Sequence, residues 1–345
     1  MNKKSIHIIL WSLCLAVLLL FILDLILGSV SIPLKSSFNI LTGHQDNENW
    51  GYIILQLRLP RAVNALLTGA GLAVAGLMMQ TLFRNPLADP YILGISSGSS
   101  LGVAIFVMAT SAFSIKPLMQ FNLLSSWGQV IAAMAGAILI FILIVSVASK
   151  LKDSVSLLIV GIMFGSLTTA LVSVLQYFSK PELVQKFVIW TLGSLSSANW
   201  QQLQIMIPVV IAGILIALYL IKPMNALLLG ENDARVTGVN INRTRYLILI
   251  STSVIAGALT AFNGPIAFIG MVVPHLVRML FGTSNHRIVF PASIIFGSSL
   301  LLACDIISQV PGGKIILPIN AVTALFGAPV VLWIILGKKN LRTSF

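Results

Sequence analysis

The sequence predicts an all-α, polytopic membrane protein with about ten transmembrane helices. Of its 345 residues, 57% are hydrophobic and only 9% are charged, whereas about a quarter of the residues in a soluble domain carry charge. The apolar residues also form continuous runs of about 20 residues, which is the length that a helix needs to cross the hydrocarbon core. Because these runs do not alternate between apolar and polar residues, they are not barrel strands.

Ten apolar runs are predicted to be spans. They cover residues 6–27, 62–83, 92–107, 130–147, 157–178, 203–221, 246–262, 266–280, 288–307 and 317–336. The first run follows Lys3 and Lys4, but it is too long for a signal peptide and no small-residue cleavage site follows it, so we predict a retained span. We therefore expect a single transmembrane domain over residues 1–345.

The positions of lysine and arginine indicate the orientation, because these residues accumulate on the cytoplasmic side. With the N-terminus inside, the inner segments hold 14 of the 21 basic residues. The 7 outer ones are Lys35, Arg58, Arg61, Lys116, Lys180, Lys186 and Lys314. Both termini are therefore predicted in the cytoplasm, and the chain is expected to be a multi-pass protein of the cytoplasmic (inner) cell membrane. Since the basic residues lie in short loops, the net charge of +12 does not indicate nucleic-acid binding.

The sequence lacks the common catalytic motifs. Its closest approach to a nucleotide-binding loop, GGKI at residues 312–315, has neither the spacing nor the hydroxyl of a P-loop. There is no H-E-x-x-H or C-x-x-C motif, and the four histidines are scattered over predicted spans and loops. We therefore predict no catalytic residue, no metal site, no cofactor and no enzyme activity in this chain.

A few ionisable residues fall inside the predicted spans, where they are costly and therefore candidates for function. The four ionisable residues within predicted spans are Asp24, His275, Arg278 and Asp305. All except His275 lie within about one turn of a span end, so snorkelling or a helix-end partner is the simpler interpretation for those three. A proton-coupled carrier needs a carboxylate deep in the bilayer, and none is predicted there.

Two polar stretches are predicted to meet soluble partners. Residues 222–245 (KPMNALLLGENDARVTGVNINRTR) form the longest polar interruption in the second half and are placed in the cytoplasm. Arg58 and Arg61 lie in LRLPR on the outer side, against the positive-inside trend. They are either two solvated arginines that cap a span or a basic patch that guides an acidic soluble partner.

Several blocks resemble the iron-siderophore and cobalamin importer permeases, the FecCD-type membrane subunits of type II ABC importers. The resemblance extends over residues 58–102 and over the blocks WTLGSLSSANW (190–200), LGENDARVTGVNINRTR (229–245), GPIAFIGMVVPHLVRML (264–280) and LFGAPVVLW (325–333). It implies a ten-helix permease in a homo- or heterodimer with a second permease subunit. An ABC ATPase subunit dimer would bind ATP and Mg, and an extracellular or periplasmic substrate-binding protein would deliver the substrate.

The resemblance also implies roles for particular residues. Contact with the ATPase would fall in residues 229–239, at Gly230, Glu231, Asp233, Ala234, Arg235 and Gly238. Docking of the binding protein would use Arg58 and Arg61, while a third external arginine of the family corresponds to Gln309, so Lys314 is expected to supply that charge. The inner constriction of the translocation path resembles Ser154, Val155 and Ser156. Lys222, Arg243 and Arg245 are interpreted as ordinary positive-inside anchors.

The main functional hypothesis is a permease subunit that imports an iron-siderophore complex, with haem or cobalamin as alternative cargo. A hypothesis of another class is an ion-coupled secondary transporter, because Pro and Gly interrupt residues 85–90 and 263–267 in a way that hints at an inverted repeat. A third is a structural or signalling membrane protein. Dependence of transport on an added ATPase and ATP discriminates among them.

Overall fold

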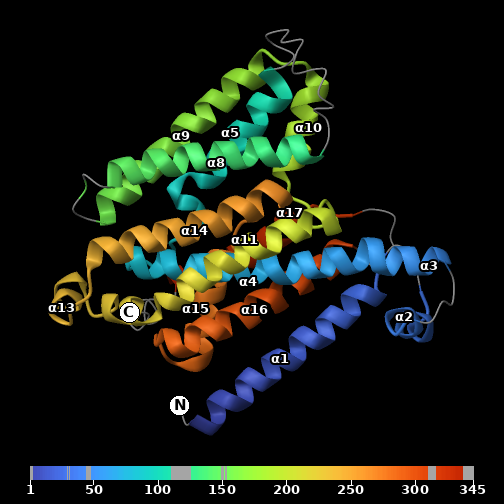
Figure 1. The fold of residues 1–345 in the computed structure, drawn as a ribbon, viewed down its shortest axis with the longest axis horizontal. Helices are drawn as coiled ribbons and strands as arrows, with labels where there is room; N and C mark the ends of the chain where they lie inside the picture. The colour runs from blue at the N-terminus through green and yellow to red at the C-terminus, as the bar shows by residue number, and fades with distance from the viewer. Residues whose placement is uncertain are drawn as a thin grey trace.

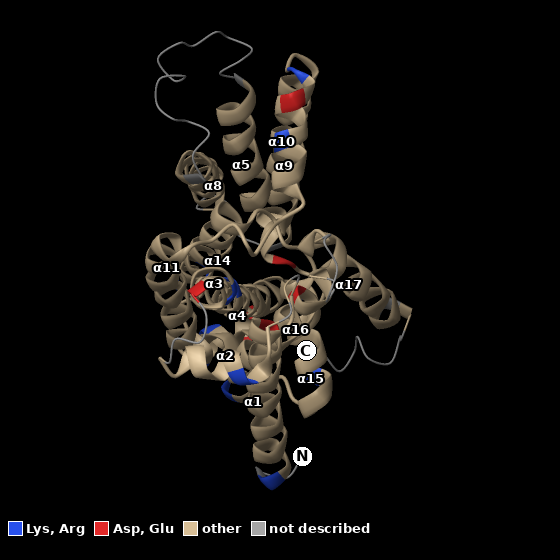
Figure 2. Cartoon of the chain, turned by 90° about the vertical axis from the view of Figure 1, so that its right-hand side faces the viewer, with Lys and Arg blue, Asp and Glu red and all other residues tan. Residues whose placement is uncertain are grey.

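A computed structural model describes residues 3–28, 30, 32–43, 48–109, 126–148, 151, 154–309 and 316–336. Over these ranges the chain is helical and contains no β-strand, which confirms the predicted all-α class (Figure 1). Most of the ribbon carries no lysine, arginine, aspartate or glutamate, as Figure 2 shows. This is the pattern expected when long helices are surrounded by lipid.

Helix α4 (Leu59–Phe83) runs through the centre of the bundle and is buried along nearly its whole length (Figure 1). Its neighbours are α11 (Trp200–Tyr219), α14 (Ile241–Asn263), α15 (Ile269–Phe281) and α16 (His286–Ser308).

Glycines let the backbones around α4 approach closely. Gly69 faces Gly297 on α16, and Gly76 faces Gly270 on α15; a methyl group on Gly69 or Gly76 would overlap the carbonyl oxygen of the glycine opposite. Small residues at a helix crossing allow such contacts within membranes. The small residues of α4 therefore serve helix packing.

A second group of helices lies beside this core, drawn in teal to yellow-green in Figure 1. It contains α5 (Ile95–Ala104), α8 (Ser126–Ala148), α9 (Ser154–Tyr177) and α10 (Pro181–Thr191). Helix α5 packs tightly on α8, and the π-helix η3 (Ile105–Ala109) continues α5. Helix α1 (Lys3–Ile26) packs along α16, and α17 (Ile319–Leu336) contacts α15 and α16.

Each of the ten predicted runs coincides with a helix. Within the described ranges, seven helices are long and apolar enough to cross a membrane: α1, α4 with the segment before it, α8, α9, α11, α14 and α16. The runs at 92–107, 266–280 and 317–336 correspond to shorter apolar helices, namely α5 with η3, α15 and α17. The count of ten spans and the cytoplasmic termini stay predictions.

The remaining elements are short helices that the run-length argument does not predict. On the side of α1's C-terminal end they are α2 (Leu34–Leu41), α3 (Glu48–Tyr52) and the π-helix η1 (Ile53–Arg58), which leads into α4. The 3-10 helix η2 (Pro90–Leu93) precedes α5, and α12 (Ile221–Leu227) and α13 (Glu231–Val236) connect α11 to α14. None holds a continuous apolar run of membrane length, which is why run length alone misses them.

Candidate functional site

The segment 229–239 forms a small projection built on α13. Ala234 is its only fully buried side chain and anchors the helix, while Leu229 is 65% exposed and Val236 is 88% exposed. Glu231 and Asp233 occupy the first turn and Arg235 the last, an arrangement that complements the helix dipole. Exposed apolar side chains on a projecting segment are a type of surface that can bind another protein.

Gly238 ends this projection with a turn that favours glycine. Its φ is +83°, in the left-handed region. Val239 N donates to Ala234 O at 3.0 Å, and Gly238 N donates to Arg235 O at 3.0 Å. These two bonds form a Schellman motif, in which the residue at the position of Gly238 is left-handed and is usually glycine. The motif sets the direction in which the chain returns to α14.

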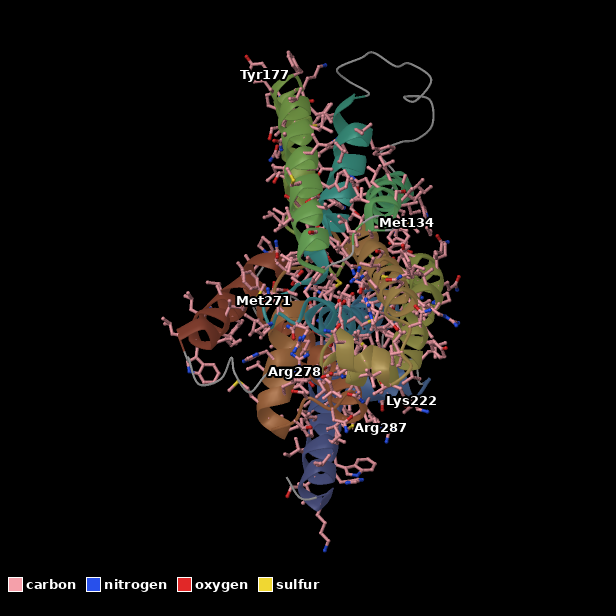
Figure 3. The ribbon with its side chains drawn as sticks, turned by 90° about the vertical axis from the view of Figure 1, so that its left-hand side faces the viewer. Met134, Tyr177, Lys222, Met271, Arg278 and Arg287 are labelled. Atoms are coloured by element: carbon pink, nitrogen blue, oxygen red, sulfur yellow. The ribbon has the colours of Figure 1, made fainter. Side chains whose placement is uncertain are left out.

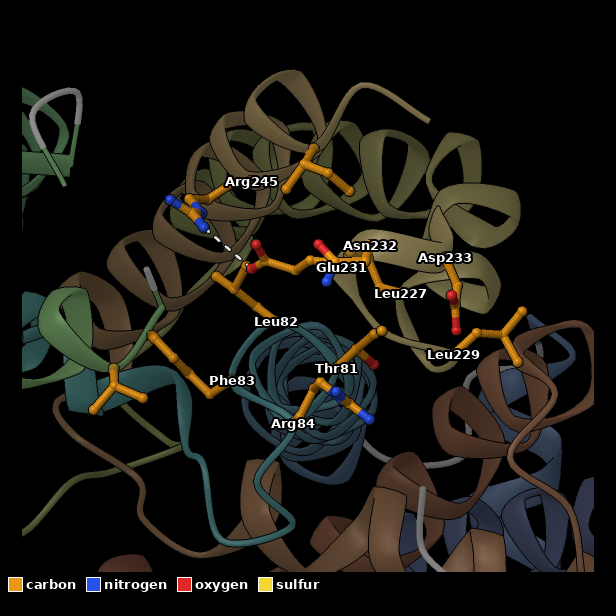
Figure 4. Close-up of a pocket in the computed structure, with 13 residues that line it drawn as sticks. Thr81, Leu82, Phe83, Arg84, Leu227, Leu229, Glu231, Asn232, Asp233 and Arg245 are labelled. Carbon is orange, nitrogen blue, oxygen red and sulfur yellow. Dashed lines mark hydrogen bonds and ion pairs between the residues drawn. The ribbon is translucent and has the colours of Figure 1, made fainter. Parts of the chain in front are cut away.

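A cavity of about 470 Å³ lies between this segment and the end of α4 (Figure 4). Its lining comes from three parts of the chain: residues 81–84 at the end of α4, Val155 on α9, and the stretch from Leu227 to Arg245. Arg84 ends α4 in the left-handed region with a φ of +46°. Glu231 and Arg245 form an ion pair across the cavity wall, with Nη2 and Oε1 3.2 Å apart.

Arg245 is not the ordinary positive-inside anchor that the sequence analysis describes. Its side chain is buried, with 4% of the residue exposed, and its partners include groups on other described segments of the chain. Besides the ion pair with Glu231, its Nη1 donates to the carbonyl of Leu151 at 3.3 Å. The sequence contains a signal of this burial. The buried residues in the first turns of α14 are Ile241, Thr244, Arg245 and Ile248. Their i, i+3, i+4, i+7 spacing marks a helix face that is turned to the protein interior.

Arg58, which is predicted on the outer side, binds groups within the subunit. It is 7% exposed, and its Nη1 donates to the carbonyls of Leu25 at 2.9 Å and Ile26 at 2.6 Å, while Nη2 donates to the carbonyl of Val30. The last carbonyls of a helix have no partner within it, and a cation at this end is favourable. Arg58 therefore caps the C-terminal end of α1.

Arg61 also binds a partner within the subunit. Its Nε and Nη2 donate to the carboxylate of Asp305 at 2.8 Å and 2.7 Å, and Nη2 also donates to Ser308 at 3.1 Å. The interpretation of Arg58 and Arg61 as solvated caps is therefore wrong, because both are held inside the bundle. Their role in docking stays a prediction, and Lys314 lies outside the described residues.

Gln309 belongs to the same cluster. Its Nε2 donates to Asp24 at 2.9 Å and to Asp305 at 3.2 Å. Asp24 and Asp305, the two carboxylates near predicted span ends, thus have helix-end partners and do not snorkel. Arg278, which is labelled in Figure 3, is likewise buried. Its Nη1 donates to the side-chain oxygen of Gln80 at 2.7 Å. Tertiary contacts therefore hold these groups inside the protein.

The predicted constriction residues begin α9. Ser154 is the first residue of this helix, Val155 is 66% exposed and lines the cavity beside Glu231, and Ser156 is half-buried. Farther along α9, the exposed side chains of Ser166, Thr169 and Ser173 form a row of hydroxyls on its surface. Their role in a translocation path stays a prediction.

The chain is similar to known transport proteins over almost its whole length. The sequence model of the FecCD transport family matches residues 15–337. The chain is 35% identical over 334 residues to the hemin transport system permease protein HmuU of Yersinia pestis, covering 96% of this chain and 98% of the relative. It is 36% identical over 287 residues to the vitamin B12 import system permease protein BtuC of Klebsiella pneumoniae, covering 83% of each.

A solved structure also resembles the chain. It is an inward-facing conformation of a metal-chelate type ABC transporter, with a TM-score of 0.81 and 30% sequence identity. The match covers 96% of this chain and 99% of the other. A second solved structure, PsaBC from Streptococcus pneumoniae, has a TM-score of 0.55 at 15% identity and shows a similar fold alone.

Proposed function

Because the chain belongs to the FecCD transport family, we propose that it carries an iron-siderophore complex across the cytoplasmic membrane. The chain is the permease subunit of an ATP-binding-cassette importer, with the fold of the type II importers. The observation that supports a chelate as cargo is the range of its relatives, which includes a hemin permease, a vitamin B12 permease and a metal-chelate type transporter. Hemin, vitamin B12 and a metal chelate each hold a metal ion in an organic framework.

The exposed face of α9 is consistent with such cargo. From Val155 to Tyr177 this helix carries no charged side chain, and its exposed surface combines aliphatic groups with the hydroxyls of Ser166, Thr169 and Ser173. A neutral, mixed surface of this kind suits an organic ligand, whereas a hard bare cation favours several carboxylate and carbonyl oxygens. A second permease subunit facing this helix would complete the path.

Energy would come from separate ATPase subunits that contact residues 229–239. The exposed Leu229 and Val236 beside the charged turn of α13 supply a mixed apolar and polar contact surface. A nucleotide state changes the packing of the permease only if the ATPase binds this segment with different free energies in the outward-open and inward-open states. A binding protein on the opposite side would deliver the substrate.

Haem is the second candidate cargo, because the hemin permease relative is matched over 98% of its own length. Reconstitution of the permease in vesicles with its ATPase and binding-protein partners tests which cargo it carries. Uptake of an ⁵⁵Fe-labelled ferric hydroxamate, an ⁵⁵Fe-labelled ferric catecholate, hemin and cyanocobalamin is then compared. ATP-dependent uptake of a ferric siderophore supports the proposal, and selective uptake of hemin or cobalamin replaces it. Uptake driven by an ion gradient without the ATPase contradicts the ATP-driven part.

A further inference from the structure

Helix α2 has an inverted distribution of side chains. Its buried residues are Ser36, Ser37 and Ile40, whereas Leu34 is 68% exposed and Phe38 is 69% exposed. On a soluble protein, a surface helix buries its apolar side chains and exposes its polar ones. Because α2 buries two serines and exposes its largest apolar side chains, one side of its surroundings must itself be apolar.

The exposed part of α2 is divided into an apolar stripe and a polar stripe. Since successive residues of a helix are about 100° apart, Leu34, Phe38 and Leu41 share an arc of about 60°, and we call them the apolar stripe. All three are exposed. The exposed Lys35 and the partly exposed Asn39 lie on a different side of the helix. An apolar stripe beside a polar one is typical of a helix that lies in the plane of a membrane interface.

The position of α2 in the fold agrees with such a location. Helix α1 is long and apolar enough to cross the membrane and ends at Ile26, so this end lies near the edge of the hydrocarbon layer. Helix α2 contacts α1 and η1. In Figure 1 it is seen nearly end-on beside the C-terminal end of α1, while α4 runs across the picture. Helix α2 is therefore placed at the membrane edge, crosswise to the central helix.

The neighbouring surface of α1 indicates which partner covers the apolar stripe. The last three turns of α1 expose four large apolar side chains, those of Leu18, Leu19, Ile22 and Leu23. As part of a spanning helix, these side chains face lipid. A soluble partner would cover the apolar stripe only while it is docked, and the stripe would otherwise remain in water, which is unfavourable. Lipid is a permanent partner, so it is the one that the exposed surface favours.

We infer that α2 is an interfacial anchor, which inserts Leu34, Phe38 and Leu41 among the acyl chains of a phospholipid surface and keeps Lys35 in water. The anchor is joined to the rest of the bundle by Ile32, Ile40 and Ile54, which form a small buried cluster. Ile54 belongs to η1, and η1 leads directly into α4. Helix α2 thereby fixes the depth at which the central helix begins.

Spin labels on the permease alone, in phosphatidylcholine nanodiscs, test the depth of α2. In a background with Cys14→Ser and Cys304→Ala, nitroxide labels are attached to Phe38→Cys and Lys35→Cys. Collisions with oxygen, which concentrates in lipid, and with a water-soluble nickel chelate are then measured. Labels at Leu18 on α1 and at Val236 on α13, both exposed, are the lipid and water references. If Phe38→Cys does not fold, Leu34→Cys replaces it.

The nickel collision rate is expected to be several-fold lower at Phe38 than at Lys35, with Phe38 similar to Leu18. Equal nickel collision rates at the two positions would overturn the anchor and leave the apolar stripe open to a soluble partner. Because no ATPase, binding protein or cargo is present, the result does not depend on the proposed function.

A charge placed on the apolar stripe supplies a second test. With the label on Leu41→Cys, Phe38→Asp is expected to raise the nickel collision rate several-fold, because a carboxylate cannot remain among acyl chains. Lys35→Asp is the matched control on the polar stripe and should leave the rate unchanged. Both positions are exposed, so neither substitution disturbs a packed core. An unchanged rate in Phe38→Asp would contradict insertion of α2.

Discussion

Arg61 on α4 and Asp305 on α16 form a buried ion pair across 244 residues of sequence, with Nη2 2.7 Å from Oδ1 and Nε 2.8 Å from Oδ2. Two parallel bonds of this kind are short and directional. The aspartate side chain is fully buried, so Arg61 replaces water as a partner of its carboxylate. The pair thereby fixes the outer end of the central helix against α16.

Removing one partner of this pair should destabilise the protein strongly. Arg61→Gln or Asp305→Asn leaves an uncompensated buried charge, which costs about 3–5 kcal/mol, while the double variant should be less destabilised than either single one. Thermal unfolding in nanodiscs measures the effect. Lys35→Gln is the control, because this outer lysine is exposed. Wild-type stability in both single variants would show that the pair contributes nothing.

Gly238→Ala should disturb the projection while the subunit stays inserted. An L-residue in the left-handed region costs about 1–2 kcal/mol, and the φ of Gly238 is +83°. We expect weaker association with the ATPase and less uptake per ATP. Gly51→Ala is a matched control, since a methyl group at either glycine meets no atom within 4 Å and Gly51 lies in α3 with ordinary helical backbone. Equal coupling in the two variants would contradict the importance of the turn.

Gly76→Ala should impair folding through the crossing of α4 and α15. The added methyl group overlaps the backbone of Gly270, and forcing a packed site apart costs about 1–3 kcal/mol or more. The yield of monodisperse protein after detergent extraction and its melting temperature report the loss. Gly257→Ala serves as the comparison, because its methyl group would lie 3.5 Å from Ala137, an ordinary contact. A Gly76→Ala protein as stable as Gly257→Ala would argue against the close crossing.

A topology reporter tests the orientation. Because both termini are predicted in the cytoplasm, a fluorescent protein fused after Lys339 should be active inside the cell, and alkaline phosphatase at the same point should be inactive. The same two reporters placed after Lys180 supply the opposite control, since Lys180 is predicted outside. An external signal at Lys339 would overturn the predicted count of ten spans with a cytoplasmic N-terminus.

The sequence by itself determined the helices of the bundle and the place of the polar segment 229–239 between two of them. A bilayer leaves no partner for exposed backbone groups, so each apolar run of membrane length must become a helix. The polar interruption that contains segment 229–239 is also recognisable in the sequence, because so many charged residues cannot remain in lipid. Short helices such as α2 and α10 were not predictable in this way, since they lack such a run.

Only the tertiary structure decided what the charged residues do. Arg58, Arg61 and Arg245 are three basic residues at predicted span ends, and composition does not distinguish a solvated anchor from a buried one. Arg58 binds the end of α1, Arg61 binds Asp305, and Arg245 binds Glu231 and Leu151. These partners lie between 14 and 244 residues away along the sequence. Whether an arginine is buried depends on such distant oxygen atoms, because only they can replace the water that it loses.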